Sequence, residues 1–117
     1  MRPEFALAAL LFAAAPALSE THEVRMLNRG ETGSMVYEPD HLRIAPGDSV
    51  RFLVGHRSHN AASIESMMPE GAEPFIGRID EEIEVTFDVE GTYGIKCSPH
   101  LGMGMVMVVQ VGDGPLD

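Results

Sequence analysis

Apolar and polar residues alternate along several short stretches of this chain, and this period of two constrains the fold more than any other feature. In the clearest stretch, from Glu82 to Phe87, every second residue is apolar and the others are Glu or Thr. Successive side chains of a strand point to opposite faces, so this stretch predicts an antiparallel strand with one buried face. Comparable stretches predict further strands at residues 22–28, 34–37, 41–45, 50–54, 93–97 and 105–111.

Turns rich in Gly and Pro separate the predicted strands, and Pro46-Gly47-Asp48 is one of them. The segment Ala62–Met68 instead predicts a short helix, which Pro69 ends. A chain of 117 residues fits one small domain, and no internal repeat or linker divides it. We therefore expect an all-β sandwich of about eight strands with one short helix.

The first residues have the pattern of a targeting segment. Phe5–Leu18 is an uninterrupted apolar run of 14 residues, shorter than the roughly 20 that span a bilayer. Small residues at Ala17 and Ser19 fit a cleavage before Glu20. We predict that residues 1–19 form a secretory signal peptide, with an uncleaved membrane anchor as the alternative, and that residues 20–117 form the mature domain.

Charge and cysteine content exclude several kinds of site and partner. The chain has 18 acidic and 8 basic residues, a net charge of −10. This balance would repel a phosphate backbone, so nucleic acid is not an expected partner. One cysteine cannot form an intrachain disulfide or a metal site of four thiolates.

The most informative stretch is a loop between the last two predicted strands. Cys97, His100 and Met105 lie within nine residues of one another there, and a loop that folds back can bring their donor atoms together. His59, just past the predicted strand 50–54, is the best candidate for a fourth ligand. Two imidazoles, one thiolate and a weak thioether are the donor set of a blue-copper electron-transfer site.

Other readings of these residues stay open. A lone Cys or Met often only fills space in a core, and zinc could occupy the same donor set. Cys97 with His100 could serve a cysteine hydrolase, although no third group or oxyanion device is recognisable. Copper storage or delivery is a further alternative, with Cu(I) bound transiently by Met67, Met68, Met103 and Met107. We interpret His22, His41 and His56 as surface residues.

Several motifs together resemble one known family. They are Met26-Leu27-Asn28, Gly33-Ser34-Met35-Val36, Ala45-Pro46-Gly47-Asp48, His59-Asn60, Pro69-Glu70-Gly71, Gly91-Thr92-Tyr93-Gly94, Cys97-Ser98-Pro99-His100 and Met103-Gly104-Met105. From about residue 22 to Asp113 the chain resembles the pseudoazurins, which are type 1 blue copper proteins of the cupredoxin group. The resemblance implies a Greek-key β-sandwich, one copper ion that alternates between Cu(II) and Cu(I), and no enzymatic turnover.

The same resemblance implies roles for individual residues and for partners. The copper ligands would be His59, Cys97, His100 and Met105. Met35 and Pro99 would pack beside the site, Asn60 would tie the two ligand loops together, and Met103 would belong to an apolar docking patch. The protein would be a periplasmic monomer that exchanges electrons with a nitrite or nitrous oxide reductase or a c-type cytochrome. Two departures are Ser58, where the family often has glycine, and the absence from this sequence of a helical tail after the last strand.

Charge is unevenly distributed along the chain. No carboxylate lies between Asp48 and Glu65 or between Glu90 and Asp113, and these two segments carry all four expected ligands. They also carry Arg51, Arg57 and Lys96, and Arg29 lies near Met35 in sequence. We therefore expect a dipolar molecule whose copper end is neutral to basic, with Arg29, Arg57 and Lys96 as cations facing an acidic partner.

Overall fold

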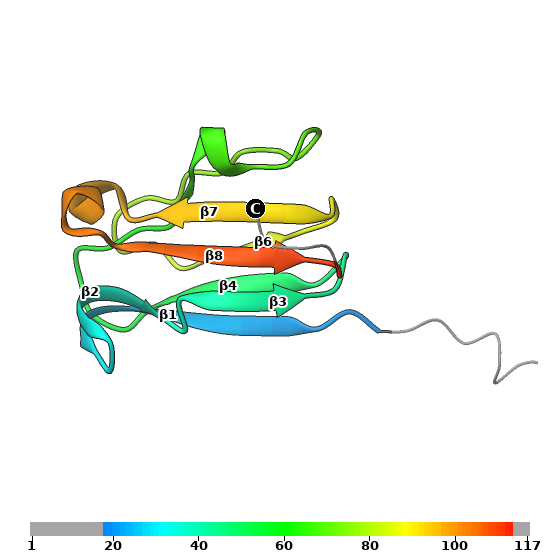
Figure 1. The fold of residues 1–117 in the computed structure, drawn as a ribbon. Coiled ribbons are helices and arrows are strands. Elements are labelled where there is room, and N and C mark those ends of the chain that lie inside the picture. Colours follow the sequence, from blue (N-terminus) through cyan, green and yellow to red (C-terminus); the bar gives the residue numbers. More distant parts are fainter. Residues whose placement is uncertain (1–17, 114–117) are drawn as a thin grey trace, which may run out of the picture.

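A computed structural model describes residues 18–113, which form a two-layered β-sandwich (Figure 1). The 3₁₀ turns are η1 (Glu65–Met67) and η2 (Ser98–Met103). The eight strands of the described part are β1 (Thr21–Gly30), β2 (Gly33–Glu38), β3 (His41–Ile44), β4 (Ser49–Val54), β5 (Ala62–Ser63), β6 (Ile83–Thr86), β7 (Gly91–Lys96) and β8 (Val106–Val111). The predicted all-β sandwich of about eight strands is confirmed.

Each layer is a sheet of four strands. The first has the order β2-β1-β4-β6 and the second the order β3-β8-β7-β5. The expected antiparallel pairing of the 82–87 stretch is present between β6 and β4. The β1–β4 and β3–β8 pairs are parallel, however, so both sheets are mixed. Between β2 and β4 the chain leaves the first sheet to form β3 in the second sheet, and it returns to the first sheet as β4 beside β1.

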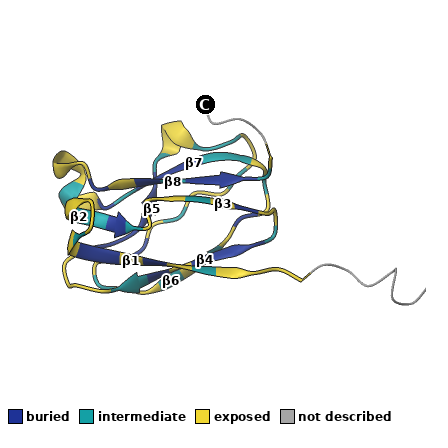
Figure 2. Ribbon diagram, turned by 60° about the horizontal axis from the view of Figure 1, so that its bottom comes forward, coloured by how far each residue is buried: buried dark blue, intermediate teal, exposed yellow. Residues whose placement is uncertain are grey.

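The core lies between the two sheets, where the alternating residues meet (Figure 2). The expectation that alternate residues of the last two strands are buried is confirmed. The buried residues of this set are Tyr93, Ile95, Cys97, Met105, Met107, Val109 and Val111. Ile83 and Val85 are only partly buried, because β6 is the edge strand of its sheet. Strand β7 therefore delivers Cys97 into the interior at its end, as its parity predicts.

The helix expected over Ala62–Met68 is absent from the structure. Ala62 and Ser63 instead form β5, which pairs with Lys96 and Ile95 of β7, and a single 3₁₀ turn follows. The Ser63 backbone also donates to the Phe75 carbonyl at 2.9 Å. A helix of two turns gains little on its own, because nucleation is costly, so pairing with the sheet edge determines the conformation.

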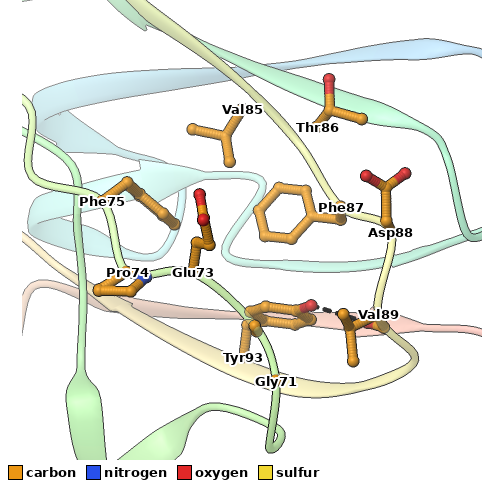
Figure 3. Close-up of a pocket in the computed structure, with 11 residues that line it drawn as sticks. Gly71, Glu73, Pro74, Phe75, Val85, Thr86, Phe87, Asp88, Val89 and Tyr93 are labelled. Carbon is orange, nitrogen blue, oxygen red and sulfur yellow. Dashed lines mark hydrogen bonds between the residues drawn. The ribbon is translucent and has the colours of Figure 1, made fainter.

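A shallow cleft of about 300 Å³ opens beside the core, between the segment at Gly71–Phe75 and the β6–β7 connection (Figure 3). Its aromatic lining belongs to the core packing. Phe87 and Tyr93 meet edge to face with ring centroids 4.8 Å apart, and the Tyr93 hydroxyl donates to the Val89 carbonyl at 2.7 Å. Burial raises the pKa of Tyr93. None of the residues proposed from the sequence as site residues lines this cleft.

Within residues 18–113 no helix is long and apolar enough to cross a membrane. The predicted signal peptide, residues 1–19, lies almost wholly outside the described residues. Of its residues, the structure describes only Leu18 and Ser19.

Candidate metal centre

One loop supplies three of the four candidate ligands, and its backbone hydrogen bonds fold it back on itself. Cys97 follows β7, His100 lies in η2, and Met105 immediately precedes β8. The Cys97 amide donates to the Met105 carbonyl at 3.0 Å, and the Met105 amide donates to the His100 carbonyl at 3.3 Å. Gly104 closes the turn with a left-handed φ of 80°, a conformation that costs glycine little. The loop therefore holds a thiol, an imidazole and a thioether residue together.

The fourth candidate arrives from the connection between β4 and β5. The Cys97 Sγ lies 3.7 Å from the His59 Nδ1 and 3.4 Å from the His100 Nδ1. The three donor atoms lie within 4.8 Å of one another, and the two imidazole rings have centroids 4.9 Å apart. His59, Cys97 and Met105 are each 0% exposed, whereas His100 is half-buried. The tertiary fold thus brings together residues that are 38 positions apart in the chain.

An asparagine from β1 orients the buried imidazole. The Asn28 side-chain oxygen accepts a hydrogen bond from the His59 Nε2 at 2.7 Å. Because that oxygen can only accept, Nε2 carries the proton and Nδ1 keeps its lone pair toward the Cys97 sulfur. Burial, followed by the nearby charges of His100 and His56, lowers the pKa of His59 and favours its neutral, ligating form. This role of Asn28 has no local signal in the sequence, because the contact joins residues 31 positions apart.

Asn60 joins the two loops that carry the candidate ligands. Its amide nitrogen donates to the Gly77 carbonyl at 2.9 Å and to the Ser98 hydroxyl at 3.2 Å, and its oxygen accepts from the Ser98 amide at 2.7 Å. The Tyr37 hydroxyl donates to the Asn60 carbonyl at 2.7 Å. Burial, with a smaller contribution from the Cys97 charge, raises the pKa of Tyr37, which keeps it a neutral donor. These contacts fix His59 relative to Cys97 through their immediate neighbours.

Ser58 adopts a backbone conformation that glycine favours. Its φ is 82°, in the left-handed region, which explains why a glycine suits this position. The Ser58 amide donates to the Asp80 Oδ1 at 2.6 Å, and the Asp80 amide donates to the His59 carbonyl at 2.8 Å. The Arg57 Nε lies 3.8 Å from the same carboxylate. The copper end is therefore not free of carboxylates, because the fold brings Asp80 beside a segment that contains none.

Exposed apolar residues flank the half-buried His100 in the chain. Met103 is 61% exposed, Leu101 is 45% exposed and Pro99 is also exposed. Met35, whose φ is 54°, is half-buried and packs against the core cluster that contains Cys97 and Met105.

The remaining residues singled out in the sequence are dispersed. Arg29 is exposed on β1, Arg57 is exposed in the β4–β5 connection, and Lys96 is half-buried at the end of β7. His41 and His56 are surface residues as expected. His22 is not, because it is partly buried and pairs with Asp48 at 3.0 Å. Among the four methionines considered for Cu(I), Met67 and Met103 are exposed, but Met107 is buried.

The donor set fits copper better than it fits the alternatives. A thiol and a thioether residue are soft, and two neutral imidazoles complete the set that copper takes in electron-transfer sites. A cysteine hydrolase needs a nucleophile that a substrate can reach, whereas Cys97 is completely buried. The arrangement can therefore hold a metal ion beneath the surface with one imidazole edge near the solvent.

Comparisons with known proteins agree with this geometry. Residues 24–112 match the family model described as copper binding proteins, plastocyanin/azurin family. The chain is 52% identical to a pseudoazurin of Paracoccus pantotrophus over 110 residues, which cover 94% of this chain and 76% of that protein. It is 46% identical to a putative pseudoazurin of Rhizobium leguminosarum bv. viciae, with coverage of 94% and 72%.

Solved structures show the same likeness. The refined crystal structure of pseudoazurin from Methylobacterium extorquens AM1 superposes with a TM-score of 0.79 at 46% identity, covering 80% of this chain and 76% of that one. A pseudoazurin structure from Hyphomicrobium denitrificans gives a TM-score of 0.76 at 41% identity, with coverage of 80% and 76%. The sequence, the sandwich and the His-Cys-His-Met loop arrangement lead to one conclusion: the chain belongs to the pseudoazurins, type 1 copper proteins of the plastocyanin/azurin family.

Proposed function

We propose that this protein carries single electrons between redox proteins of the periplasm, through one copper ion held by His59, Cys97, His100 and Met105. The observation that supports this most strongly is the convergence of the His59 Nδ1, Cys97 Sγ and His100 Nδ1 within 4.8 Å of one another. A bound copper ion supplies a one-electron couple between Cu(II) and Cu(I). The protein itself carries out no substrate turnover.

The chain's residues hold the site rigid and dry. Cys97 and His59 are wholly buried, and the Asn28 and Asn60 hydrogen bonds fix the His59 imidazole and the Cys97 loop from two sides. Hydrogen bonding around a ligating sulfur influences the reduction potential, and Pro99 cannot donate such a bond because it has no N–H. A site held in one geometry needs little rearrangement when the charge of the metal changes.

The exposed patch around His100 suits brief docking. Met103 and Leu101 offer apolar surface beside the half-buried imidazole, and small interfaces are typical of redox encounters. A partner seated on this patch would approach the metal centre through the His100 ring. We infer that electrons enter and leave there, in exchange with a nitrite or nitrous oxide reductase or a c-type cytochrome.

Cations near this end would steer an acidic partner. Arg57 is 88% exposed in its side chain but faces Asp80, so its charge is partly offset, whereas Lys96 lies next to Cys97. Lys96→Glu should slow electron exchange with a c-type cytochrome and reduce its salt dependence more than Arg57→Glu does. Arg51→Glu is the control, because Arg51 pairs with Glu84 at 2.9 Å, outside the ligand loops. Equal effects in all three variants would contradict steering by the copper end.

The visible spectrum tests the metal assignment directly. The oxidised protein loaded with copper should show an intense thiolate-to-copper absorption at about 600 nm. Cys97→Ala should abolish it, Met105→Leu should keep copper with a changed reduction potential, and His41→Ala should change neither. Absence of the band in the unaltered protein would refute the blue-copper assignment. Ready transfer of the copper to a chelator during redox cycling would favour storage or delivery instead.

Export and processing complete the proposal. The predicted signal peptide, residues 1–19, would carry the chain to the periplasm, and the mature form would begin at Glu20 and act as a monomer. Mass spectrometry of the protein recovered from a periplasmic fraction gives the cleavage site, and gel filtration gives the oligomeric state. A mature chain that still contained residues 5–18 would favour the membrane anchor.

A further inference from the structure

A second cluster of metal-binding side chains lies at the end of the sandwich opposite η2, where β1 begins and β8 ends (Figure 1). It consists of Glu20, His22 and Asp48, whose ligand atoms all lie within 4.8 Å of one another. The His22 Nε2 is 3.0 Å from the Asp48 Oδ2 and 3.9 Å from the Glu20 Oε1. The parallel pairing of β1 with β4 places the three residues together.

Asp48 provides a carboxylate that its hydrogen bonds fix in position. Its side chain is 7% exposed, and its Oδ1 accepts from the Glu20 amide at 3.0 Å. Its Oδ2 faces the His22 imidazole and also accepts from the Ala45 amide at 3.2 Å. These three contacts hold one ligand of the cluster in place before any ion arrives.

The cluster opens into a cleft with an excess of negative charge. The cleft has a volume of about 400 Å³ and is lined by Glu20, His22, Arg43, Asp48, Glu90 and Asp113 among others. In the described part of the chain, its lining thus has four carboxylates and one guanidinium, whose Nη1 donates to the Gly112 carbonyl at 2.8 Å. This space admits a hydrated cation, and its charge attracts one.

We propose that Glu20, His22 and Asp48 form a second metal site, separate from the copper centre, that binds a divalent ion of the zinc type. One imidazole and two carboxylates are ligands that zinc takes, with water completing the coordination. The imidazole favours zinc over calcium or magnesium, and the lack of a sulfur donor in the cluster disfavours Cu(I). The ion would fasten the start of β1 to the start of β4.

The proposed cleavage before Glu20 would add to this site. In a chain that begins there, the Glu20 nitrogen, 3.0 Å from the Asp48 Oδ1, becomes an α-amine. A free amine with a histidine two positions later can also chelate a metal through the backbone amides, without Asp48. That mode would remove the His22 backbone from its ladder with β4, where His22 pairs with Val50. The two modes are separated by comparing chains with and without the free amine.

Zinc titration of the copper-loaded protein by calorimetry tests the proposal. The absorption at about 600 nm is followed in the same experiment, to show that the copper centre is unchanged. We expect one zinc ion per chain. Loss of a group that only hydrogen-bonds a metal ligand costs about 10–100-fold in metal affinity. Loss of a ligand itself, in His22→Gln or Glu20→Gln, should therefore weaken binding about tenfold or more. His41→Gln, which alters an exposed imidazole outside the cluster, should leave binding unchanged.

Three outcomes would overturn the proposed site. Zinc binding that is equal in the unaltered protein and in His22→Gln would show adsorption elsewhere on the surface. Binding by a chain that begins at Glu20, but not by one that begins at Leu18, would show an amino-terminal chelate in place of the three-side-chain site. A calorimetric signal that appears while the absorption band disappears would show displacement of copper and no second site.

Discussion

Replacing Asn60 by Ala should destabilise the protein strongly, because this side chain connects the two ligand loops. Asn60 is 3% exposed and forms three side-chain hydrogen bonds, two of them with Ser98. At about 0.5–1.5 kcal/mol for each bond, their loss costs about 1.5–4.5 kcal/mol. The Ser98 amide and the Gly77 carbonyl would also lose their side-chain partner, which places the expected cost in the upper half of that range. For a domain of this size the loss corresponds to a fall in Tm on the order of 10–20 °C.

Urea denaturation of the metal-free protein, followed by circular dichroism, measures this cost without a contribution from bound metal. Ser98→Ala is the matched control, because it removes only the bond to the hydroxyl and should cost about 0.5–1.5 kcal/mol. A loss below about 1 kcal/mol for Asn60→Ala would refute the reasoning, since it would mean that the loops hold their positions by other contacts. The copper-loaded variant should also show a shifted visible spectrum, because Ser98 adjoins Cys97.

Three further outcomes follow from single side chains. Ser58→Gly should stabilise the protein by up to about 1 kcal/mol in urea denaturation, because relief of a left-handed φ exceeds the entropy cost of glycine, whereas Ser66→Gly should not. Asn28→Ala should lower copper affinity about 10–100-fold in competition with a chelator, because the His59 imidazole loses its orienting bond; unchanged affinity would contradict that role. Asp48 has a lowered pKa in the folded state, so its stabilisation is present above the ordinary value of 3.8 and is lost as the pH falls below it. Asp48→Asn should therefore flatten the decline of stability in acid, and an unchanged slope between pH 5 and about 2 would count against this assignment.

Local patterns predicted much of the fold. The alternation of residues 82–87, 93–97 and 105–111 predicted strands correctly, because the period of side chains along a strand is a property of the backbone. It also predicted the buried face of the last two strands, whereas Ile83 and Val85 are only partly buried at the sheet edge. The same reasoning was wrong for Ala62–Met68, where a helical composition was overridden by pairing of Ser63 with Ile95 at the sheet edge. A segment of this length has too little intrinsic preference to resist a tertiary contact.

The charged neighbours of a residue were the feature that the sequence predicted least well. The absence of carboxylates from the segments 49–64 and 91–112 is true of the sequence, but Asp80 from another segment lies against Ser58 and Arg57. From the sequence we expect His22 on the surface, but it pairs with Asp48, 26 positions away. Electrostatic surroundings depend on which segments meet in space, and the linear distribution of charge does not contain that information.

The sequence by itself determined the sandwich, the burial of Cys97 and the spacing of Cys97, His100 and Met105, because these follow from short-range periodicity and from one loop. Only the tertiary structure decided that His59 reaches that loop, that Asn28 orients its imidazole and that Glu20, His22 and Asp48 meet at the far end. These contacts join residues far apart in the chain, and they form because β1 and β4 pair in parallel while β7 carries its end to the His59 connection. Sequence spacing thus defined the donors within one loop, and strand pairing brought the residues from other loops to them.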